Sequence, residues 1–390
     1  MSEIQESGCW PNAQQELLLR AALWPGQEAI NAFLQWKAQI DIERLGAGST
    51  RLLPLLRHNL IAQGFDDALL ARCQSVARYS WYQNHMLFAR SAKTLAALHA
   101  AGIETMILKG SALIALHYRD FSLRPMSDFD ILVPTSEFSR AVKVLEEQGW
   151  KPQAWRAPEM VSDDYFSFIH AHAFENREGN SLDLHRHILP QCCENDADDD
   201  FWRDAVATTV VETPTRALNA ADTLLHICIH GVRWEGVHPL RWVADAMMIL
   251  KSHDLDWNRL LEQSRKRHLH LGLHDALQYL KNTMRADVPD EVLNALQKLP
   301  TTRAQHIEYS AWTRDPESYG PLMKLWLRYR WFARWENAVG IVNPVSGFVR
   351  YLQLVWKLRH PWQIPLYAWT KAVRQTRIWS RNRAMSLRAK

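Results

Sequence analysis

Two aspartates that are one residue apart, Asp128 and Asp130, are the residues whose types and spacing most clearly suggest chemistry. They stand in the segment DFDILV, whose apolar residues predict a β-strand. Because side chains alternate between the faces of a strand, both carboxylates would project from the same face. Such neighbours repel each other unless water screens them or a divalent cation lies between them. The pair therefore indicates either a solvated strand edge or a metal site. The neighbouring segments distinguish between these two interpretations.

A third aspartate stands in a later segment with the same alternation. SLDLHRHI also reads as a strand, with Asp183 and His185 on one face and leucines on the other. If this strand lies beside DFDILV, three carboxylates meet, which is hard to explain without cations. Two metal ions about 3.5–4 Å apart can activate an attacking oxygen and stabilise a leaving one. We therefore predict Asp128, Asp130 and Asp183 as metal ligands and catalytic residues, with Mg²⁺ or Mn²⁺ as the metal.

A glycine and a serine stand upstream, where the predicted strand ETMILKG opens into the helical segment SALIALHYRD. Gly110 would let the backbone approach a ligand closely, and the start of a helix offers unpaired N–H groups to phosphate. The Ser111 hydroxyl could add a further contact. One helix separates this phosphate-binding pattern from the acidic strand, so the two patterns fit a single site.

This order of motifs resembles the nucleotidyltransferase superfamily that includes DNA polymerase beta, the tRNA CCA-adding enzymes and the aminoglycoside nucleotidyltransferases. The string LKGSALIALHYRDFSLRPMSDFDILV is similar to a large, poorly characterised bacterial nucleotidyltransferase family. That family has Lys-Gly before the helix, an arginine before the acid pair and a later Asp-x-His, and Lys109, Arg124 and His185 match those positions. RLLPLLRHNL and LLHICIHGVRW…LRWVADAMMIL also look like that family, so the resemblance covers roughly residues 50 to 260.

The resemblance implies a Mg²⁺-dependent transfer of a nucleotidyl group from a nucleoside triphosphate, most simply ATP, to an acceptor hydroxyl. Asp128 and Asp130 would bind the metal that carries the triphosphate, and Asp183 would complete a second metal site and help deprotonate the acceptor. Lys109 and Arg124 would neutralise phosphate charge or form salt bridges to the acids. The residues expected at the nucleotide are Lys109, Gly110, Ser111, Arg124, His185 and Arg241. The acceptor, whether small molecule, protein or RNA end, is not specified.

The alternative function is non-catalytic: a nucleotide-binding scaffold or sensor whose basic tail binds nucleic acid or an anionic membrane. A scaffold has no use for a repulsive carboxylate cluster, so the three acids favour the enzyme.

Other candidate residues have simpler explanations. His226 and His230 are spaced i, i+4 in HICIH, as in a helical metal pair, but the glutamate of H-E-x-x-H is missing, so we expect core or capping histidines. Arg241 and Asp245 would either line the nucleotide cleft or pair along a helix. The five cysteines show no C-x-x-C spacing, which is typical of reduced thiols in a cytoplasmic protein.

The apolar spacing predicts an α+β protein: a small mixed β-sheet nucleotidyltransferase core flanked by N-terminal and C-terminal helical regions. We expect Ser136 to cap the helix after DFDILVP, and Gly102 and Gly149 to end helices. The expected regions are a helical region at 1–95, the catalytic core at 96–190, a helical region completing the cleft at 191–319 and a basic, Trp-rich region at 320–390.

The last region differs from the rest in charge, because Glu336 is its only acidic residue from Pro321 onward, among many lysines and arginines. Interleaved aromatic and basic residues can stack bases and bind phosphates, or can lie at an anionic membrane surface. They can also form helices whose Trp side chains pack inward. We therefore expect nucleic acid or an anionic membrane as a partner of 320–390. The N-terminus predicts no secretory signal, which favours a cytoplasmic protein, peripheral to the membrane if the tail binds lipid.

Overall fold

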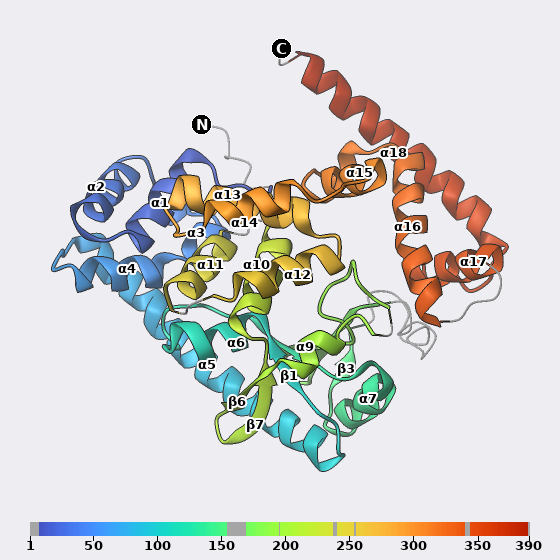
Figure 1. Ribbon diagram of the computed structural model, residues 1–390, viewed down its shortest axis with the longest axis horizontal. Helices are drawn as coiled ribbons and strands as arrows, with labels where there is room; N and C mark the ends of the chain where they lie inside the picture. The colour runs from blue at the N-terminus through green and yellow to red at the C-terminus, as the bar shows by residue number, and fades with distance from the viewer. Residues whose placement is uncertain are drawn as a thin grey trace. The chain divides into compact units, whose positions relative to one another are not determined.

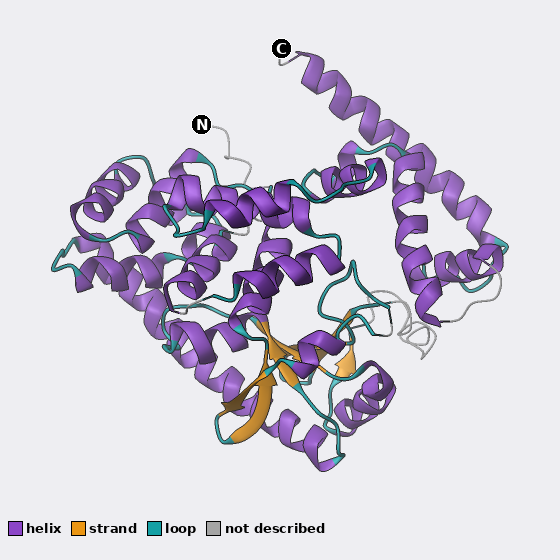
Figure 2. Ribbon diagram, viewed as in Figure 1, coloured by secondary structure: helices purple, strands orange, loops and turns teal. Residues whose placement is uncertain are grey.

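The computed structural model describes residues 8–153, 169–194, 196–236, 240–252, 255–339 and 344–388. Figure 2 shows the strands gathered in one sheet, while most of the remaining described chain is helical, so the fold is α+β as predicted. The chain divides into two compact units. Unit 1 comprises residues 1–96, 106–130 and 204–314, and unit 2 comprises residues 97–105, 131–203 and 315–390.

The N-terminal part of unit 1 is helical in its described residues, as the apolar spacing predicts. Its α-helices are α1 (Ala13–Leu23), α2 (Gly26–Lys37), α3 (Ala47–Thr50), α4 (Leu53–Ala62) and the long α5 (Ala68–Ala100) (Figure 1). Leu18 and Leu19 on α1 and Phe33 and Trp36 on α2 are almost completely buried, so these helices share a core. Helix α5 ends just before Gly102, whose φ of 70° confirms it as the expected stop.

The sheet has seven strands in the order β3-β4-β5-β2-β1-β7-β6. Strands β1 and β7 are parallel, while the pairs β3–β4, β4–β5 and β6–β7 are antiparallel, so the sheet is mixed. The bounds of its strands are β1 (Met106–Leu108), β2 (Asp128–Leu132), β3 (Lys151–Pro152), β4 (Ala171–Glu175), β5 (Ser181–His185), β6 (Val206–Val210) and β7 (Thr213–Ala217).

The predicted hairpin is confirmed in β4 and β5, which join through a loop in which Gly179 has a φ of 74°. Residues 166–168 of the predicted first strand lie outside the described part of the chain. The sequence did not predict β3 or the β6–β7 hairpin, which add strands at both ends of the sheet.

Short helical elements connect the central strands. Helix α6 (Lys109–Leu113) follows β1 directly and continues as the π-helical turn η2 (Ile114–Tyr118). After β2 come the 3₁₀ turn η3 (Thr135–Glu137) and helix α7 (Phe138–Glu147). The prediction for Ser136 was wrong, because it lies inside η3, and Glu137 at the N-cap makes no side-chain capping bond. Gly149, with a φ of 84°, follows α7 as expected.

Helices return after the sheet. The bounds of those in unit 1 are α10 (Ala220–Gly231), α11 (Arg241–Ser252), α12 (Trp257–Lys266), α13 (His270–Met284), α14 (Asp290–Gln297) and α15 (Arg303–Trp312). Unit 2 contains the short α9 (Asp199–Arg203) and the C-terminal helices α16 (Pro321–Val339), α17 (Pro344–Val355) and α18 (Gln363–Arg388). Among the described residues, no helix is long and apolar enough to cross a membrane.

The C-terminal helices contribute to a buried cluster of unit 2. Phe332 of α16 and Tyr351 and Leu352 of α17 are at most 5% exposed and pack together with Cys193. Ile364 of α18 packs against the same cluster. Part of the aromatic content of the tail is therefore core, which was one of the three explanations that the sequence left open.

Candidate active site

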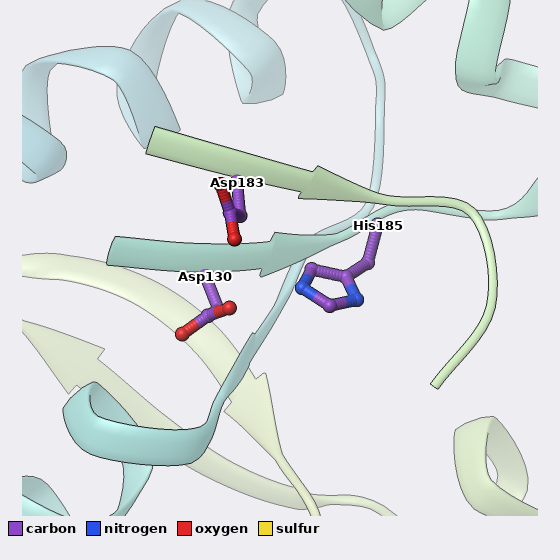
Figure 3. A group of neighbouring side chains, drawn as sticks. All are labelled: Asp130, Asp183 and His185. Atoms are coloured by element: carbon purple, nitrogen blue, oxygen red, sulfur yellow. The ribbon is translucent and has the colours of Figure 1, made fainter. Parts of the chain in front are cut away.

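The strongest candidate site lies on one face of strands β2 and β5, which are neighbours in the sheet. Asp130 of β2 and Asp183 and His185 of β5 each offer a ligand atom, and these atoms all lie within 4.8 Å of one another. Figure 3 shows the three side chains gathered beside the two strands. Alternation explains this, because the leucines of β5 and Phe129 of β2 are fully buried on the opposite face. The predicted meeting of the two aspartate strands is thus what the structure shows.

Asp128 is not a member of this group, although we expected it there. It begins β2, is only half-buried, and accepts a hydrogen bond of 3.4 Å from the Ser127 hydroxyl. Since Asp130 is 2% exposed, the two carboxylates of DFDILV differ in environment even though they are two residues apart on one strand. His185, and not Asp128, is the third residue whose ligand atom lies within reach of those of Asp130 and Asp183.

His185 is held by its backbone and by one ring nitrogen. Its carbonyl accepts the backbone N–H of Val133 at 3.2 Å, which ties the end of β5 to the end of β2. Its Nδ1 lies 3.3 Å from the carbonyl oxygen of His187. Because a carbonyl can only accept, Nδ1 carries the proton in this bond, and in the neutral ring Nε2 has the lone pair that a metal needs.

The neighbouring His187 is held by a buried hydrogen bond to a carboxylate. Its Nδ1 lies 2.8 Å from Oδ2 of Asp198, and the other oxygen of Asp198 accepts the backbone N–H of Ile188 at 3.4 Å. Both side chains are buried. The segment that supports the His185 ring is therefore anchored by two contacts to one carboxylate.

Lys109 forms a salt bridge with the acidic group. Its Nζ donates to Oδ1 of Asp130 at 2.6 Å, so the salt bridge that we considered as an alternative to phosphate binding is present. Lys109 also has a φ of 48°, in the left-handed region that residues other than glycine rarely adopt. The turn from β1 into α6 is strained at the residue whose side chain reaches the site, an arrangement often found at functional positions.

Gly110 and Ser111 shape the same turn from inside. A Cβ built on Gly110 would collide with Nη1 of Arg124 and lie 3.1 Å from two side-chain atoms of Met126, so only glycine leaves room for this arginine. The Ser111 side chain is completely buried, and its hydroxyl donates to the carbonyl oxygen of Leu108 at 2.9 Å. The serine hydroxyl expected at the phosphates thus closes the strand-to-helix turn.

Arg124 is engaged in a buried ion pair with Asp245 of α11. Its Nε and Nη2 donate to the two carboxylate oxygens, each at 2.8 Å, and the Tyr118 hydroxyl donates to Oδ1 of Asp245 at 2.8 Å. All three side chains are less than 9% exposed. Burial alone would lower the pKa of Arg124, but the Asp245 carboxylate outweighs it and raises that pKa above its usual value.

The loop that carries Arg124 into β2 is held from two further sides. The amide of the buried Asn84 on α5 donates to the carbonyl oxygens of Phe121 and Arg124, at 2.7 and 2.8 Å. Nη1 of Arg241 donates to the carbonyl oxygen of Pro125 at 2.9 Å. Burial, aided by the nearby cations Arg124 and Arg51, lowers the pKa of Arg241 to about 10, so the guanidinium stays charged at neutral pH.

These contacts revise one pairing that the sequence suggested. Arg241 and Asp245 stand four residues apart on α11, but the oxygens of Asp245 receive Arg124 and Tyr118, while Arg241 donates to a backbone carbonyl. Sequence reasoning missed Tyr118 and Asn84 altogether. The only available signal was that an arginine before the acid pair and an aspartate on a later helix both matched the resembled family.

The two histidines of α10, which we expected to be core or capping residues, differ in burial. His226 is buried, whereas His230 near the end of the helix keeps 43% of its side chain exposed, with Nδ1 4.0 Å from Glu235. Their ring centroids are 6.5 Å apart. Neither belongs to the one group of potential metal ligands found among the described residues.

Comparison with known proteins finds one matching sequence family and several similar structures. The sequence model of a family described as uncharacterised nucleotidyltransferase matches residues 46–285. No curated protein matches significantly. Among solved structures, the antibiotic-resistance factor ANT(2'')-Ia is similar over 50% of this chain and 97% of its own, at 14% identity and a TM-score of 0.32. An antigenic nucleotidyltransferase-like protein from Paracoccidioides brasiliensis is similar over 56% of this chain and 95% of its own, at 13% identity and a TM-score of 0.34.

Proposed function

Since the chain belongs to the family of uncharacterised nucleotidyltransferases, we propose that it moves a nucleotidyl group from a nucleoside triphosphate to an acceptor hydroxyl, releasing pyrophosphate. The chain is a nucleotidyltransferase, and the proposal concerns its metal, its nucleotide and the roles of its residues. The observation that carries it is the group of Asp130, Asp183 and His185, whose ligand atoms lie within 4.8 Å of one another.

The donor set of this group fits a divalent cation. Asp130 and Asp183 supply carboxylate oxygens, which Mg²⁺ and Mn²⁺ prefer, and His185 supplies an imidazole in a hydrogen-bonded orientation. We assign the two aspartates as ligands of Mg²⁺ or Mn²⁺ and His185 as the third member of the site. When bound, such a cation would neutralise phosphate charge and favour ionisation of the acceptor hydroxyl.

The residues of the chain would divide the work around this site. Asp183 would accept the proton of the acceptor hydroxyl, and Asp128, half-buried at the start of β2, would face the metal that arrives with the triphosphate. Lys109 would turn from Asp130 to a phosphate oxygen. This last step needs little reorganisation, because the ammonium already lies at the acidic group.

The remaining predicted nucleotide contacts fall into two classes. Gly110 and Arg241 stay candidates for contacting a nucleotide, with ATP as the first one to test. Ser111 and Arg124 have their polar groups engaged by Leu108 and Asp245, so we assign them to holding the turn and loop that carry Lys109 and Asp130. The group of possible metal ligands favours the enzyme over the alternative of a non-catalytic scaffold or sensor.

Ligand-dependent melting tests the proposal. A metal–triphosphate complex at a hundredfold excess over its dissociation constant should stabilise the native protein by roughly 2.7 kcal/mol. We expect Mn²⁺ with ATP to raise the melting temperature of the wild type, and the rise to disappear in Asp130→Asn and in Asp183→Asn. Glu137→Gln, which removes a surface carboxylate of η3, is the matched control and should keep the rise. An undiminished rise in both aspartate variants would rule out this metal site.

The acceptor can be sought with the same proteins. Lysate incubated with wild-type protein and α-labelled triphosphate should yield a labelled product, and the Asp183→Asn protein should yield none. Equal labelling by both proteins would contradict the catalytic assignment of Asp183.

A further inference from the structure

Helix α18 begins with an exposed apolar stripe. Trp362, immediately before the helix, and Leu366 and Trp369 within it are 70%, 64% and 69% exposed. Their spacings of four and three residues place them on one side of the helix. The outward side of a helix packed on a folded unit is normally polar, so three large apolar side chains there indicate a surface that meets something.

The opposite side of α18 already packs within unit 2. Ile364 joins the buried cluster of Phe332, Tyr351 and Leu352. The ring of Tyr367 lies 5.3 Å from that of Trp356, and Nζ of Lys371 lies 4.9 Å over the Tyr367 ring. The stripe is therefore not the side by which the helix attaches to its unit.

Helix α16 repeats the feature. Leu322, Leu325 and Tyr329 are 83%, 41% and 44% exposed, with spacings of three and four residues. In Figure 1 these C-terminal helices are drawn in orange to red. Two helices of one unit thus each bury one side and expose apolar residues on another, which an accidental surface leucine does not explain.

Charge narrows the choice of partner. The sequence of α18 contains no acidic residue, and its basic residues include the half-buried Lys371 and the exposed Arg374. An apolar stripe of Trp and Leu beside lysines and arginines is typical of helices that lie in the interface of an anionic bilayer. Single-stranded RNA would use the aromatic and basic residues, but would give the exposed leucines no stacking partner. We propose that the C-terminal helices of unit 2 form a docking surface for an anionic membrane, through Trp362, Leu366 and Trp369 of the α18 stripe.

This surface is independent of the proposed transfer chemistry, and flotation of the full-length protein with lipid vesicles tests it. The wild type should bind phosphatidylcholine vesicles that contain about a quarter phosphatidylglycerol and bind pure phosphatidylcholine much less, with weaker binding as salt rises. Replacing both Leu366→Gln and Trp369→Gln should lower partitioning at least about tenfold, because the apolar area that would enter the bilayer is lost.

Two further variants distinguish a loss of membrane docking from a loss of folding. Arg374→Gln removes one exposed charge without touching the stripe and should weaken anionic binding about fivefold. Tyr79→Gln on α5 of unit 1, where the tyrosine is 66% exposed, is the matched control and should bind like the wild type. All variants change exposed side chains, so their melting temperatures should match.

The proposal is overturned by equal binding to both kinds of vesicle or by unchanged binding of the Leu366 and Trp369 double variant. It is also overturned if a single-stranded RNA oligonucleotide, but no vesicle, binds through these side chains. A dimer that dissociates in the double variant while the wild type ignores vesicles would show that a second copy covers the stripe.

Discussion

At the level of single residues, Lys109 links backbone strain to charge. Its left-handed φ of 48° costs of order 1 kcal/mol for a residue other than glycine, yet it aims the ammonium at Asp130. The 2.6 Å ion pair offsets the charge of a carboxylate that is 2% exposed. The lysine and a metal ion would therefore compete for one carboxylate, whereas the lysine and a metal-bound triphosphate would attract each other.

Lys109→Met should change two affinities in opposite directions. Mn²⁺ alone should bind about fivefold tighter, because a competing cation at a partly exposed site contributes about 1 kcal/mol. Mn²⁺ with a non-hydrolysable triphosphate should bind about tenfold more weakly, because a phosphate partner is lost. Calorimetric titration measures both, and Lys143→Met on the exposed side of α7 is the control. Two affinities that move together would show that Lys109 does not alternate between the two partners.

His172, on the opposite face of the sheet, should make the stability of the protein depend on pH. It is buried on β4 beside Phe174, and burial, aided by Lys357, lowers its pKa from 6.5 to about 4. The folded protein binds this proton less readily than the unfolded chain, so the histidine has no effect above about pH 6.5 and destabilises increasingly as the pH falls toward 4.

Between pH 7 and pH 5, we expect protonation of His172 in the unfolded chain to lower the free energy of unfolding by about 2 kcal/mol. Urea unfolding of the wild type and of His172→Gln at both pH values isolates it, because the other histidines are common to both proteins. The wild type should lose more stability than the variant over this interval. Equal losses would mean that His172 is not buried in the neutral form.

At the level of secondary-structure elements, local patterns predicted the core of the sheet and not its ends. Apolar runs and turn residues identified β1, β2 and the β4–β5 hairpin, because each has a clear period or a glycine turn. Strands β6 and β7 were missed because the segment ATTVVETPTRA alternates weakly, and only pairing with β1 makes it part of the sheet. Ser136 failed as a cap because a 3₁₀ turn precedes α7.

The same limit applies to the site. Alternation within each strand predicted that Asp130 and Asp183 would meet if the two strands are neighbours, since it fixes which side chains share a face, and β2 and β5 are neighbours. The pairing of Arg124 with Asp245, however, spans 121 residues and depends on how α11 packs. No spacing rule carries that information. Nor does a strand pattern say that Asp128, at the end of its strand, lies outside the group that His185 completes.

The Arg124–Asp245 pair joins α11 to the loop before β2, and its removal should be costly. Asp245→Asn leaves the guanidinium buried without its counter-charge, so we expect a loss of about 3–5 kcal/mol in the free energy of unfolding. Arg124→Met with Asp245→Leu should lose less than Asp245→Asn alone, because neither charge remains buried. Asp290→Asn breaks a surface ion pair with Lys281 and should change stability by less than about 1 kcal/mol.

Urea unfolding measures these losses. If the double variant is as unstable as Asp245→Asn, the buried charge is not the cause. The Asp245→Asn protein should also bind Mn²⁺ with ATP more weakly where it is still folded, since the loop leading to Asp130 loses its anchor. Unchanged nucleotide affinity would limit the pair to a structural role.

For the whole molecule, the division into units gives the C-terminal region a structural task. Residues 315–390 belong to the same compact unit as residues 131–203, which include Asp183 and His185. The matched family region ends at residue 285, so this unit contains a segment beyond the family match. The buried cluster of Cys193, Phe332, Tyr351 and Leu352 joins the two segments. We therefore expect the tail to be needed for the folding of unit 2.

A chain ending at Gly320 should expose Cys193 selectively. Burial raises the pKa of this thiol well above its usual value and excludes reagents, and both effects vanish when Phe332, Tyr351 and Leu352 are removed. In a Cys192→Ser background, alkylation of Cys193 should become at least about tenfold faster than in the full chain. Cys228 of α10, completely buried in unit 1, is the control within the same molecule and should stay protected. If Cys193 stays as protected as Cys228, the tail does not shield Cys193. If both cysteines react, the whole chain unfolds together, and the C-terminal helices are not needed by unit 2 alone.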